Sequence, residues 1–462
     1  MANLYEDASL VMVPTAYKDG KLYSHKPTDG TGDFTFTRGS DISATRVNAD
    51  GNIEKGYENL LYPSNDLTSL CSSNFRGTTA DSNQIANPIN GEVTADKFRT
   101  IVSGTSENRA RISGYIQSGV QTISLYAKYI DYKYLYIRQL ASSGNQEAIF
   151  DIELGEITFD ALLIESKIES AGDGWYRCSI TFNASTINNN LIDIGLSGSA
   201  TAFRGNVQDG VEMYLFGYML NQGLVAYPYV ETTTAPVAGG ILEDMPRLDY
   251  SGGSCPALKL EPQRTNLVEH SEYLGNYGTA FGGFIEYNST IQTPEGYNGC
   301  YTFYDSDGGV PARFREVNGG FSLGDKISHS IFVKGTPTGL MYLGDEYGSN
   351  GGGSYCSFNL QTKTLISQIG DVDSYKIEDY GNGWTRYSVI SVFGDQFGNG
   401  LLYSQIRTNA NSLNKVPLWG WQLEQDATYP TSYIPTYGTT QTRLKDVVFG
   451  AGDVNTFNSI EG

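Results

Sequence analysis

Asp173-Gly-Trp-Tyr-Arg-Cys-Ser179 is a short stretch that occurs again in the second half of the chain, as Asn382-Gly-Trp-Thr-Arg-Tyr-Ser388. The Asp-Gly and Asn-Gly dipeptides are strong signals for a tight turn between two strands. A tryptophan and an arginine follow each dipeptide in an alternating run, which is typical of a strand with one buried face. The stretch therefore predicts that one strand–turn–strand unit is used twice in this protein.

Two further landmarks repeat in the same order along the chain. Asn59-Leu60 matches Asn266-Leu267, and Gly217-Tyr-Met-Leu220 matches Gly420-Trp-Gln-Leu423. The Asp-Gly-Trp and Asn-Gly-Trp stretches are 209 residues apart, the Asn-Leu pairs 207 and the late-strand pairs 203. Three landmarks at nearly one spacing indicate an internal repeat of about 205 residues.

The composition favours strands over helices throughout the chain. The 462 residues include 54 glycines and 33 tyrosines, and 18% are charged, which fits short strands joined by tight turns. Runs such as Ser124-Leu-Tyr-Ala-Lys128 and Ser330-Ile-Phe-Val-Lys334 alternate as half-buried strands do. We therefore expect an all-β fold of two tandem jelly-roll β-sandwiches, with an extended N-terminal leader and a short C-terminal tail. A short helix is expected at residues 64–70, with Ser64 as its cap.

The repeat also predicts where the domains begin and end. A hairpin signal precedes each copy, at Asp50-Gly51 and at Ser251-Gly252. We expect five segments: an extended leader with a β-hairpin (1–58), a first jelly-roll module (59–233), a linker hairpin (234–265), a second module (266–438) and a tail (439–462).

Charge and cysteine content limit the partners of this chain. The formal net charge of −20 repels phosphate backbones, so we expect no nucleic-acid partner. The most apolar stretch, residues 211–230, is interrupted by polar residues and a proline, so we expect no membrane insertion. The N-terminus lacks the pattern of a signal peptide. The five cysteines are widely spaced without a CxxC pair, which argues against a disulfide framework or a zinc site.

Catalytic motifs are not convincing in this sequence, so we expect a binding protein and not an enzyme, without a cofactor. Asp305 and Asp307 have the opening spacing of a calcium loop but lack its later ligands, which leaves them as weak candidates for a structural calcium ion. A glycoside hydrolase needs only two suitably placed carboxylates. The densest acidic pairs are Glu378-Asp379 and Asp371 with Asp373.

Aromatic side chains are the best candidates for a ligand site. Sugars stack their C–H faces on aromatic rings, while amides and acids bind their hydroxyls. The glycan-binding candidates are Trp419, Trp421, Tyr342 and Tyr347 in the second copy and Tyr132, Tyr134, Tyr136 and Tyr218 in the first. Trp419 and Trp421 share one face of a strand by parity, so they line either a cleft or the core.

Several longer strings resemble tailed-bacteriophage virion proteins. The leader does so through Asp7-Ala-Ser-Leu-Val-Met-Val-Pro14, and the linker through Pro246-Arg-Leu-Asp-Tyr250 and Leu260-Glu-Pro-Gln-Arg-Thr-Asn-Leu267. These strings are similar to those of phage fibre and appendage proteins. The modules resemble carbohydrate-binding jelly rolls through the Asp/Asn-Gly-Trp-x-Arg strand and a closing Tyr-Pro. Thr442-Arg-Leu-Lys-Asp446 is similar to a segment that often leads into a further lectin-like domain.

The resemblance implies a structural protein of a phage particle, in the head or in a tail fibre or appendage. It implies assembly in the cytoplasm of the host bacterium, a leader that docks to capsid or tail proteins, and a homo-oligomer, with a trimer favoured. It also implies attachment to host-surface glycans. The alternatives are a capsid decoration or spacer protein that binds no ligand and, less favoured, a polysaccharide depolymerase.

Overall fold

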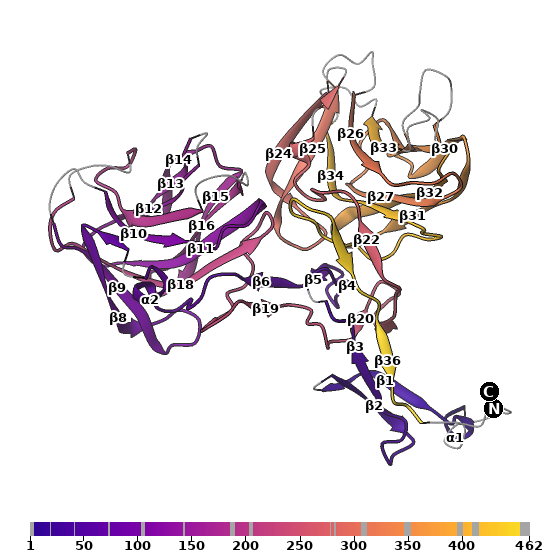
Figure 1. The fold of residues 1–462 in the computed structure, drawn as a ribbon, viewed down its shortest axis with the longest axis horizontal. Helices are drawn as coiled ribbons and strands as arrows, with labels where there is room; N and C mark the ends of the chain where they lie inside the picture. Colours follow the sequence, from indigo (N-terminus) through magenta and orange to yellow (C-terminus); the bar gives the residue numbers. More distant parts are fainter. Residues whose placement is uncertain are drawn as a thin grey trace. The chain divides into compact units, whose positions relative to one another are not determined.

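The computed structural model consists almost entirely of β-strands (Figure 1), which confirms the predicted all-β class. The structure describes residues 4–18, 20–40, 42–72, 74–102, 107–141, 144–184, 190–202, 207–277, 279–280, 283–305, 312–345, 353–394, 401–408 and 415–452. The chain divides into two compact units. One is Tyr57–Gly239, the first-module unit, and the other combines Met1–Gly56 with Gly240–Gly462, the second-module unit.

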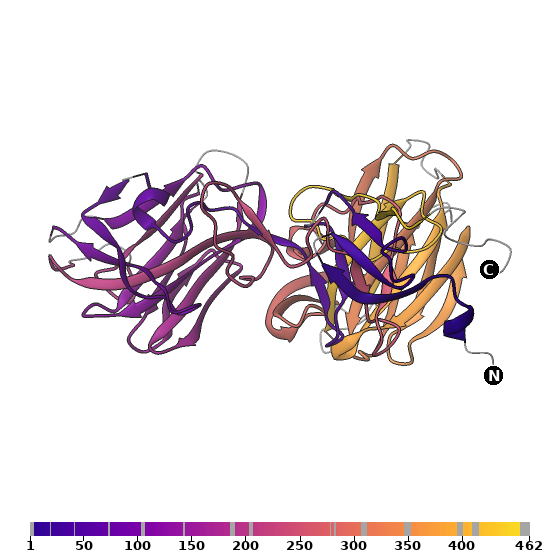
Figure 2. The ribbon, with the colours of Figure 1, turned by 90° about the horizontal axis from the view of Figure 1, so that it is seen from below.

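The first-module unit is a sandwich of two six-stranded antiparallel sheets (Figure 1 and Figure 2). One, the β12 sheet, has the order β14 (Glu156–Ala161), β13 (Gln146–Asp151), β12 (Tyr134–Gln139), β17 (Leu191–Leu196), β10 (Asn108–Ser113), β7 (Phe75–Arg76). The other, the β11 sheet, has the order β15 (Glu165–Gly172), β16 (Trp175–Ala184), β11 (Gly119–Tyr129), β18 (Glu212–Gln222), β9 (Val93–Thr100), β8 (Thr78–Ala86). Aliphatic side chains from both sheets fill the space between them.

The second-module unit contains the same sandwich. Its β28 sheet has the order β23 (Thr279–Ala280), β26 (Ala312–Gly319), β33 (Leu401–Thr408), β28 (Leu340–Asp345), β29 (Tyr355–Asn359), β30 (Thr364–Ile369). Its β27 sheet has the order β24 (Gly283–Gln292), β25 (Asn298–Asp305), β34 (Val416–Gln425), β27 (Lys326–Lys334), β32 (Trp384–Val392), β31 (Val372–Asp379). Strand for strand, the two sandwiches have one topology, as the sequence repeat predicts.

One buried asparagine closes each sandwich. Asn59 ends β6 (Tyr57–Asn59), and its amide nitrogen donates to the carbonyls of Tyr218 at 3.2 Å and Val230 at 2.8 Å. Its side-chain oxygen accepts the backbone N–H groups of Leu61 at 3.1 Å and Leu220 at 3.2 Å. All four hydrogen-bonding positions of the amide are therefore used.

Asn266 repeats this arrangement at the end of β22 (Arg264–Asn266). It donates to Trp421 at 3.2 Å and Ile434 at 2.8 Å, and accepts from Val268 at 3.1 Å and Leu423 at 3.0 Å. The Asn-Leu landmark thus repeats because the same side chain ties the entering strand to the late strand and the closing segment.

The arginine of the repeated stretch also has one role in both copies. Arg177 donates to the hydroxyl of Ser124 at 2.9 Å, and Arg386 donates to that of Ser330 at 2.8 Å. Each guanidinium also reaches a backbone carbonyl of the closing segment. The arginine therefore locks the central strand to the segment that ends the module.

The short helix differs from the prediction. It is α2 (Leu67–Leu70), and Asp66 is its N-cap, accepting the N–H groups of Thr68 and Ser69. Ser64, the predicted cap, instead shares a hydrogen bond with the hydroxyl of Tyr229. A carboxylate two residues further on is the stronger acceptor for the free N–H groups of the helix. A second short helix, α1 (Leu4–Asp7), was not predicted.

Leader and tail pair with each other. A four-stranded sheet has the order β1 (Val11–Lys18), β2 (Lys21–Lys26), β3 (Phe34–Thr37), β36 (Val447–Phe449). The tail strand β35 (Gln441–Arg443) pairs with β22. Two short segments that cannot bury a core alone are thereby held in one unit.

Both predicted hairpins form, and the first lies in the second-module unit. It consists of β4 (Thr45–Val47) and β5 (Ile53–Lys55), and the linker hairpin consists of β20 (Arg247–Asp249) and β21 (Ala257–Lys259). Ile53 packs with Trp384 and Trp419 of the second module. The remaining strand, β19 (Val237–Gly239), pairs with β6. No helix in the part of the chain that the structure describes is long and apolar enough to cross a membrane.

A buried charge cluster, the base cluster, joins leader, linker and tail. Glu261 of the linker pairs with Arg247 at 2.7 Å and with Arg443 of the tail at 3.1 Å. Asp446 of the tail pairs with Arg247 and, at 3.3 Å, with Arg38 of the leader. Burial alone would raise the pKa of Glu261, but the charges of Arg443 and Arg247 outweigh it and hold this pKa well below its usual range.

The asparagines allow a paired stability test. Asn266→Ala removes four hydrogen bonds and leaves buried backbone groups without partners, so we expect it to lower the free energy of unfolding of the second-module unit by about 3 kcal/mol. Asn59→Ala should do the same to the first-module unit. Urea unfolding followed by tryptophan fluorescence measures both. Asn65→Ala, which removes an exposed hydrogen bond, is the control, and equal stability of all three variants would contradict the role of the buried amides.

The base cluster predicts a pH dependence. Because the folded-state pKa of Glu261 lies below its unfolded value of about 4.3, its contribution is fully present above that pH and is lost as the pH falls further. We expect Glu261→Gln to lose stability at pH 6 and to show a flatter decline between pH 5 and pH 3 than the parent protein. Urea unfolding at each pH measures this. Glu243→Gln, at an exposed position, should retain the slope of the parent.

Candidate functional site

Four of the eight glycan-binding candidates are buried in this structure. Trp419, Trp421, Tyr136 and Tyr218 are each at most 1% exposed. A ring without accessible surface cannot stack on a sugar in this structure. Tyr218 and Trp421 pack within the sandwiches, and Trp419 packs against the first hairpin. Tyr136 is covered by neighbouring side chains, among them Arg138, on the outer face of the β12 sheet.

A bulge separates the two tryptophans that parity places on one strand face. The pairing of β27 with β34 shifts register between Ser330 and Phe332, next to Gly420 with φ of 67°. Trp419 therefore packs with Phe332, while the rings of Trp421 and Phe314 of the other sheet are 5.3 Å apart. A residue other than glycine is strained at this φ, so the glycine permits the bulge.

The other candidates are half-buried or lie outside the described residues. Tyr132, Tyr134 and Tyr342 are half-buried, and the rings of Tyr132 and Tyr134 meet edge-on at 6.5 Å. Tyr347 and Asp307 lie outside the described residues, as does the side chain of Asp305 at the end of β25. No cluster of three metal-binding side chains occurs among the residues that the structure describes.

Two rows of side chains cross the β28 sheet and form a surface that we call the second-module face. Tyr342 lies in the first of these rows. Strand register aligns the first row as Arg313, Arg407 and Tyr342. The alternating neighbours of these residues, among them Phe314, Ile406 and Leu343, are buried in the core. Because strand side chains alternate between faces, the row lies on the face that points away from the core.

The second row lies two residues further along each strand. Its members in register are Arg315, Gln405, Gly344 and Tyr355. The rings of Tyr355 and Tyr342 meet edge-on at 5.9 Å, so the two rows form one surface.

Arg407 and Gln405 provide the polar groups of the second-module face. The guanidinium of Arg407 lies 4.9 Å from the centre of the Tyr342 ring, within the range of a cation–π contact. Gln405 is buried and donates to the carbonyl of Asp345 at 3.3 Å, while its side-chain oxygen has no partner among the described residues. The accessible part of the face therefore combines aromatic rings with a guanidinium.

The corresponding two rows in the first module form a surface that we call the first-module face. Its charged side chains pair with one another in an ion network. Register places Arg109 and Tyr136 in one row and Arg111, Asp193 and Arg138 in the other. Arg111 binds both carboxylate oxygens of Asp193, at 2.6 and 2.9 Å, and Arg138 binds it at 2.5 Å. This buried carboxylate is satisfied by the protein itself.

Tyr136 and Glu147 complete the first-module face. Tyr136 lies over Gly195, where a Cβ would come within 2.6 Å of its ring. Burial raises the pKa of Tyr136, and burial also raises that of Glu147 although Arg138 opposes it. The first-module face is thus packed where the second-module face is half-open.

A separate hollow of about 360 Å³ lies on the β11 sheet of the first module. Trp175, 3% exposed, contributes to its wall, with the ammonium of Lys128 6.0 Å from the centre of its ring. Asp173, of the repeated stretch, lies at its rim.

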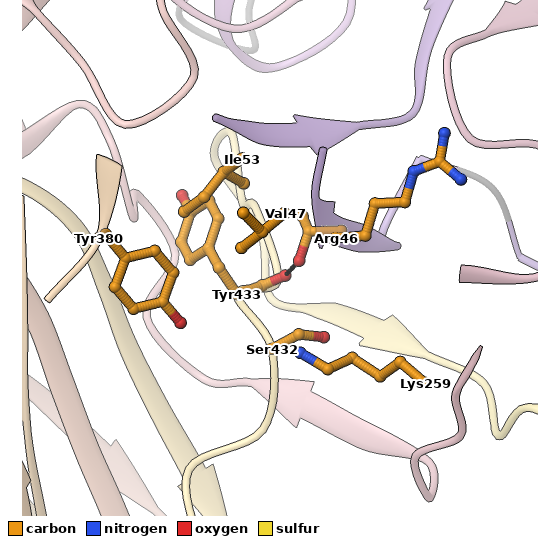
Figure 3. A pocket seen from close by; sticks show the side chains of 8 residues that line it. Arg46, Val47, Ile53, Lys259, Tyr380, Ser432 and Tyr433 are labelled. Atoms are coloured by element: carbon orange, nitrogen blue, oxygen red, sulfur yellow. Dashed lines mark hydrogen bonds between the residues drawn. The ribbon is translucent and has the colours of Figure 1, made fainter. Parts of the chain in front are cut away.

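In the second module, the first hairpin covers the equivalent surface. Ile53 packs against Trp384, the counterpart of Trp175, and the hydroxyl of Thr45 donates to the carbonyl of Tyr433 at 2.5 Å. Figure 3 shows Val47, Ile53 and Tyr433 in the wall of the pocket at this place. A pocket of about 10 Å³ remains there, enough for one water molecule.

Three of the four acidic residues singled out from the sequence lie in surface ion pairs. Glu378 pairs with Lys376 at 2.5 Å, Asp379 with Lys363 at 2.5 Å, and Asp373 with Lys326 at 2.8 Å. Two other carboxyl groups have raised pKa values. Burial raises the pKa of Asp96 to about 7 in the first module, and burial likewise raises that of Glu316 to about 7 in the second.

Sequence reasoning missed the arginines of both faces. The signal was present, because Arg109-Ala-Arg111 and Arg313-Phe-Arg315 repeat at a spacing of 204 residues. Two arginines at alternate strand positions, conserved between the copies, mark one sheet face.

No known protein family matches the sequence. No curated protein matches it either. Among solved structures, the enzymatically active domain of tailspike protein 4 from bacteriophage CBA120 is 11% identical with a TM-score of 0.23, over 35% of this chain and 21% of that one. The tandem CBM22-1–CBM22-2 domain of Paenibacillus barcinonensis Xyn10C is 8% identical with a TM-score of 0.24, over 84% and 99%. An anti-sigma factor domain-containing protein is 9% identical with a TM-score of 0.13, over 85% and 99%. These TM-scores are too low to carry an argument about function.

The ion network of the first-module face predicts a large effect of one substitution. Asp193→Asn keeps the shape of the side chain but leaves buried arginines without a counter-charge. We expect it to lower the free energy of unfolding of the first-module unit by roughly 3 kcal/mol. Thermal and urea unfolding measure the loss. Asp209→Asn, at an exposed position, is the matched control, and similar stability of the two variants would contradict a structural role for the network.

Proposed function

We propose that this protein is a structural component of a bacteriophage particle, a fibre or appendage that attaches the particle to glycans on the host surface. The observation that carries the binding role is the second-module face. There two half-buried tyrosines, Tyr342 and Tyr355, lie edge to face, and the guanidinium of Arg407 lies over the ring of Tyr342. Sugar-binding sites combine aromatic surface with a few placed polar groups in this way.

The virion location rests on the resemblance of the leader and linker strings to phage fibre and appendage proteins. The arrangement of the second-module unit agrees with an anchoring role, because the leader pairs with the tail and is fixed to the linker through the base cluster. We propose that the protein assembles in the host cytoplasm and forms a homotrimer, so that weak contacts per module add up over several copies.

A decoration or spacer role has one observation in its favour. The first-module face is filled by its own ion network, as expected of a module that extends a fibre without binding a ligand. We propose this spacer role for the first-module face alone. The surface ion pairs of the acidic residues supply no cleft of paired carboxylates, so we propose no catalytic activity.

The test is binding of fluorescently labelled full-length protein to a panel of bacterial strains, in competition with surface polysaccharide purified from each. We expect saturable binding to at least one strain, abolished by its own polysaccharide. Tyr342→Ala should weaken this binding about tenfold because the sugar loses its stacking partner. Tyr375→Ala is the control, since this exposed tyrosine belongs to β31 of the other sheet.

Binding unaffected by Tyr342→Ala would place the glycan elsewhere. Absence of binding to every strain, also by protein displayed in many copies on beads, would contradict glycan attachment and favour the spacer role for the whole chain. A fall in the viscosity of the polysaccharide during incubation would show a depolymerase instead.

A further inference from the structure

The outer faces of the β11 and β27 sheets carry the same apolar cluster, one in each module. Both clusters take one buried side chain from each of four corresponding strands. The pairs are Ala95 and Cys300, Tyr126 and Phe332, Trp175 and Trp384, and Phe216 and Trp419. The second-module cluster contains one more buried residue, Ile53 of the first hairpin. The first-module cluster contains no hairpin residue among those that the structure describes.

The hollow of about 360 Å³ lies where this cover is missing. A second difference enlarges it, because Ala171 stands in the first module where Tyr380 stands in the second, each four residues before the tryptophan of the repeated stretch. Ala171 lines the hollow, whereas Tyr380 lines the remaining pocket of about 10 Å³ in the second module. The volume of the hollow is in the range of small-molecule sites, roughly 300 to 1,000 Å³. The fold thus provides one closed and one open version of the same place.

Two hydrogen-bond donors at the hollow lack the partner that their counterparts have. In the second module, the ammonium of Lys334 and the indole N–H of Trp384 both donate to the carbonyl of Gln292, at 2.8 and 2.9 Å. Strand register gives Lys128 and Trp175 the same positions in the first module. Neither of these two side chains makes a hydrogen bond or an ion pair with any residue that the structure describes. Lys128 is half-buried and Trp175 is 3% exposed, so Lys128 is the more accessible of the two.

A carboxylate lines the same hollow without neutralising the ammonium. Asp173 is exposed at the rim and forms no ion pair with Lys128. The ammonium instead lies 6.0 Å from the centre of the Trp175 ring, at the outer limit of a cation–π contact. Ile85 and Pro88 add apolar surface to the wall. The hollow therefore presents a donor, an acceptor and apolar surface to one small ligand.

We propose that this hollow binds an N-acetylated amino sugar of the host-surface glycan. The inference rests on the proposed glycan attachment, and it adds a second binding site and the class of sugar that this site takes. An acetamido group has a carbonyl oxygen that accepts from Lys128, an N–H that donates to Asp173, and a methyl group that packs on the apolar wall. Each of its three parts thus meets one kind of group in the hollow.

The alternative groups at the same sugar carbon fit less well. A single hydroxyl oxygen spans a shorter distance than an amide does, and a hydroxyl group has no methyl group to bury. A protonated amine can bind Asp173 but is repelled by the ammonium of Lys128. Burial of the methyl group adds to the affinity because it removes apolar surface from water. The hollow therefore favours the acetylated sugar over its amine and hydroxyl forms.

Three tetrasaccharides with one β-1,4-linked glucose backbone test this preference. At C2 they carry an acetamido group (tetra-N-acetylchitotetraose), an ammonium group (chitotetraose without acetyl groups) or a hydroxyl group (cellotetraose). Binding of each sugar to the full-length protein is measured by calorimetry. We expect the acetylated sugar to bind about ten- to a hundredfold more tightly than the other two, because it gains hydrogen bonds and buries a methyl group.

Two variants assign this binding to the hollow. Ala171→Tyr introduces the side chain that the second module has at this place, so we expect it to fill the hollow and abolish binding of the acetylated sugar. Lys128→Gln should weaken the same binding about tenfold, because the carbonyl of the sugar loses a charged donor. Lys167→Gln, which removes one positive charge from β15 of the same sheet, is the matched control. Urea unfolding shows whether each variant is folded, and Tyr342→Ala should leave this binding unchanged.

Equal affinity for the three sugars, no binding of the acetylated sugar, or binding that both folded variants retain in full would each overturn the proposed site. If Ala171→Tyr does not fold, Lys128→Gln decides alone. Any of these results together with binding to host strains would leave glycan attachment standing and remove only this site. Failure of the strain panel described above would instead remove glycan attachment itself.

Discussion

A side-chain amide buried at the entrance of each sandwich is the contact on which both modules depend. The entering strand, the late strand and the closing segment are far apart in the sequence, and they meet at Asn59 in one copy and Asn266 in the other. Asparagine suits this place because it has two donors and an acceptor with two lone pairs on one short side chain. A hydrophobic residue would fill the space but would leave backbone groups without partners, and an aspartate could not donate.

The base cluster is the second long-range constraint, and its energetics are different. Charges buried away from water cost free energy, and their mutual attraction offsets that cost only when every partner is in place. The cluster therefore contributes specificity more than stability. It fixes one register of leader, linker and tail, because a slipped strand would leave Arg38 or Arg443 buried without a carboxylate. Leader and tail are short and would otherwise be weakly specified.

The repeat made the fold predictable, because each of its three landmarks marks one strand at the same place in both copies. These landmarks are Asn-Leu, Gly-Trp-x-Arg and the late strand. The site was less predictable. Parity placed Trp419 and Trp421 on one face, but a bulge at Gly420 turns them to opposite sides of the sheet. Sequence patterns predict the period of a regular strand and not where a bulge interrupts it.

The sequence also could not predict which individual aromatic side chains are buried. The residue that covers Trp384, Ile53, is more than three hundred positions away and precedes the other module. The paired arginines could have been found by aligning the two copies with each other. The carboxylate that pairs with the arginines of the first module could not have been found in this way, because Asp193 contacts Arg111 and Arg138 only when three strands pair.

The order of segments along the chain has a consequence for how such a protein can change. The second-module unit is discontinuous, and the whole first-module unit is inserted between Gly56 and Gly240. The pairing of β6 with β19 brings the two ends of this insertion together, from Tyr57 opposite Gly239 to Asn59 opposite Val237. A domain whose ends are adjacent can be removed, exchanged or duplicated without stretching its host. The first module can therefore diverge in sequence while the second-module unit around its insertion point stays intact.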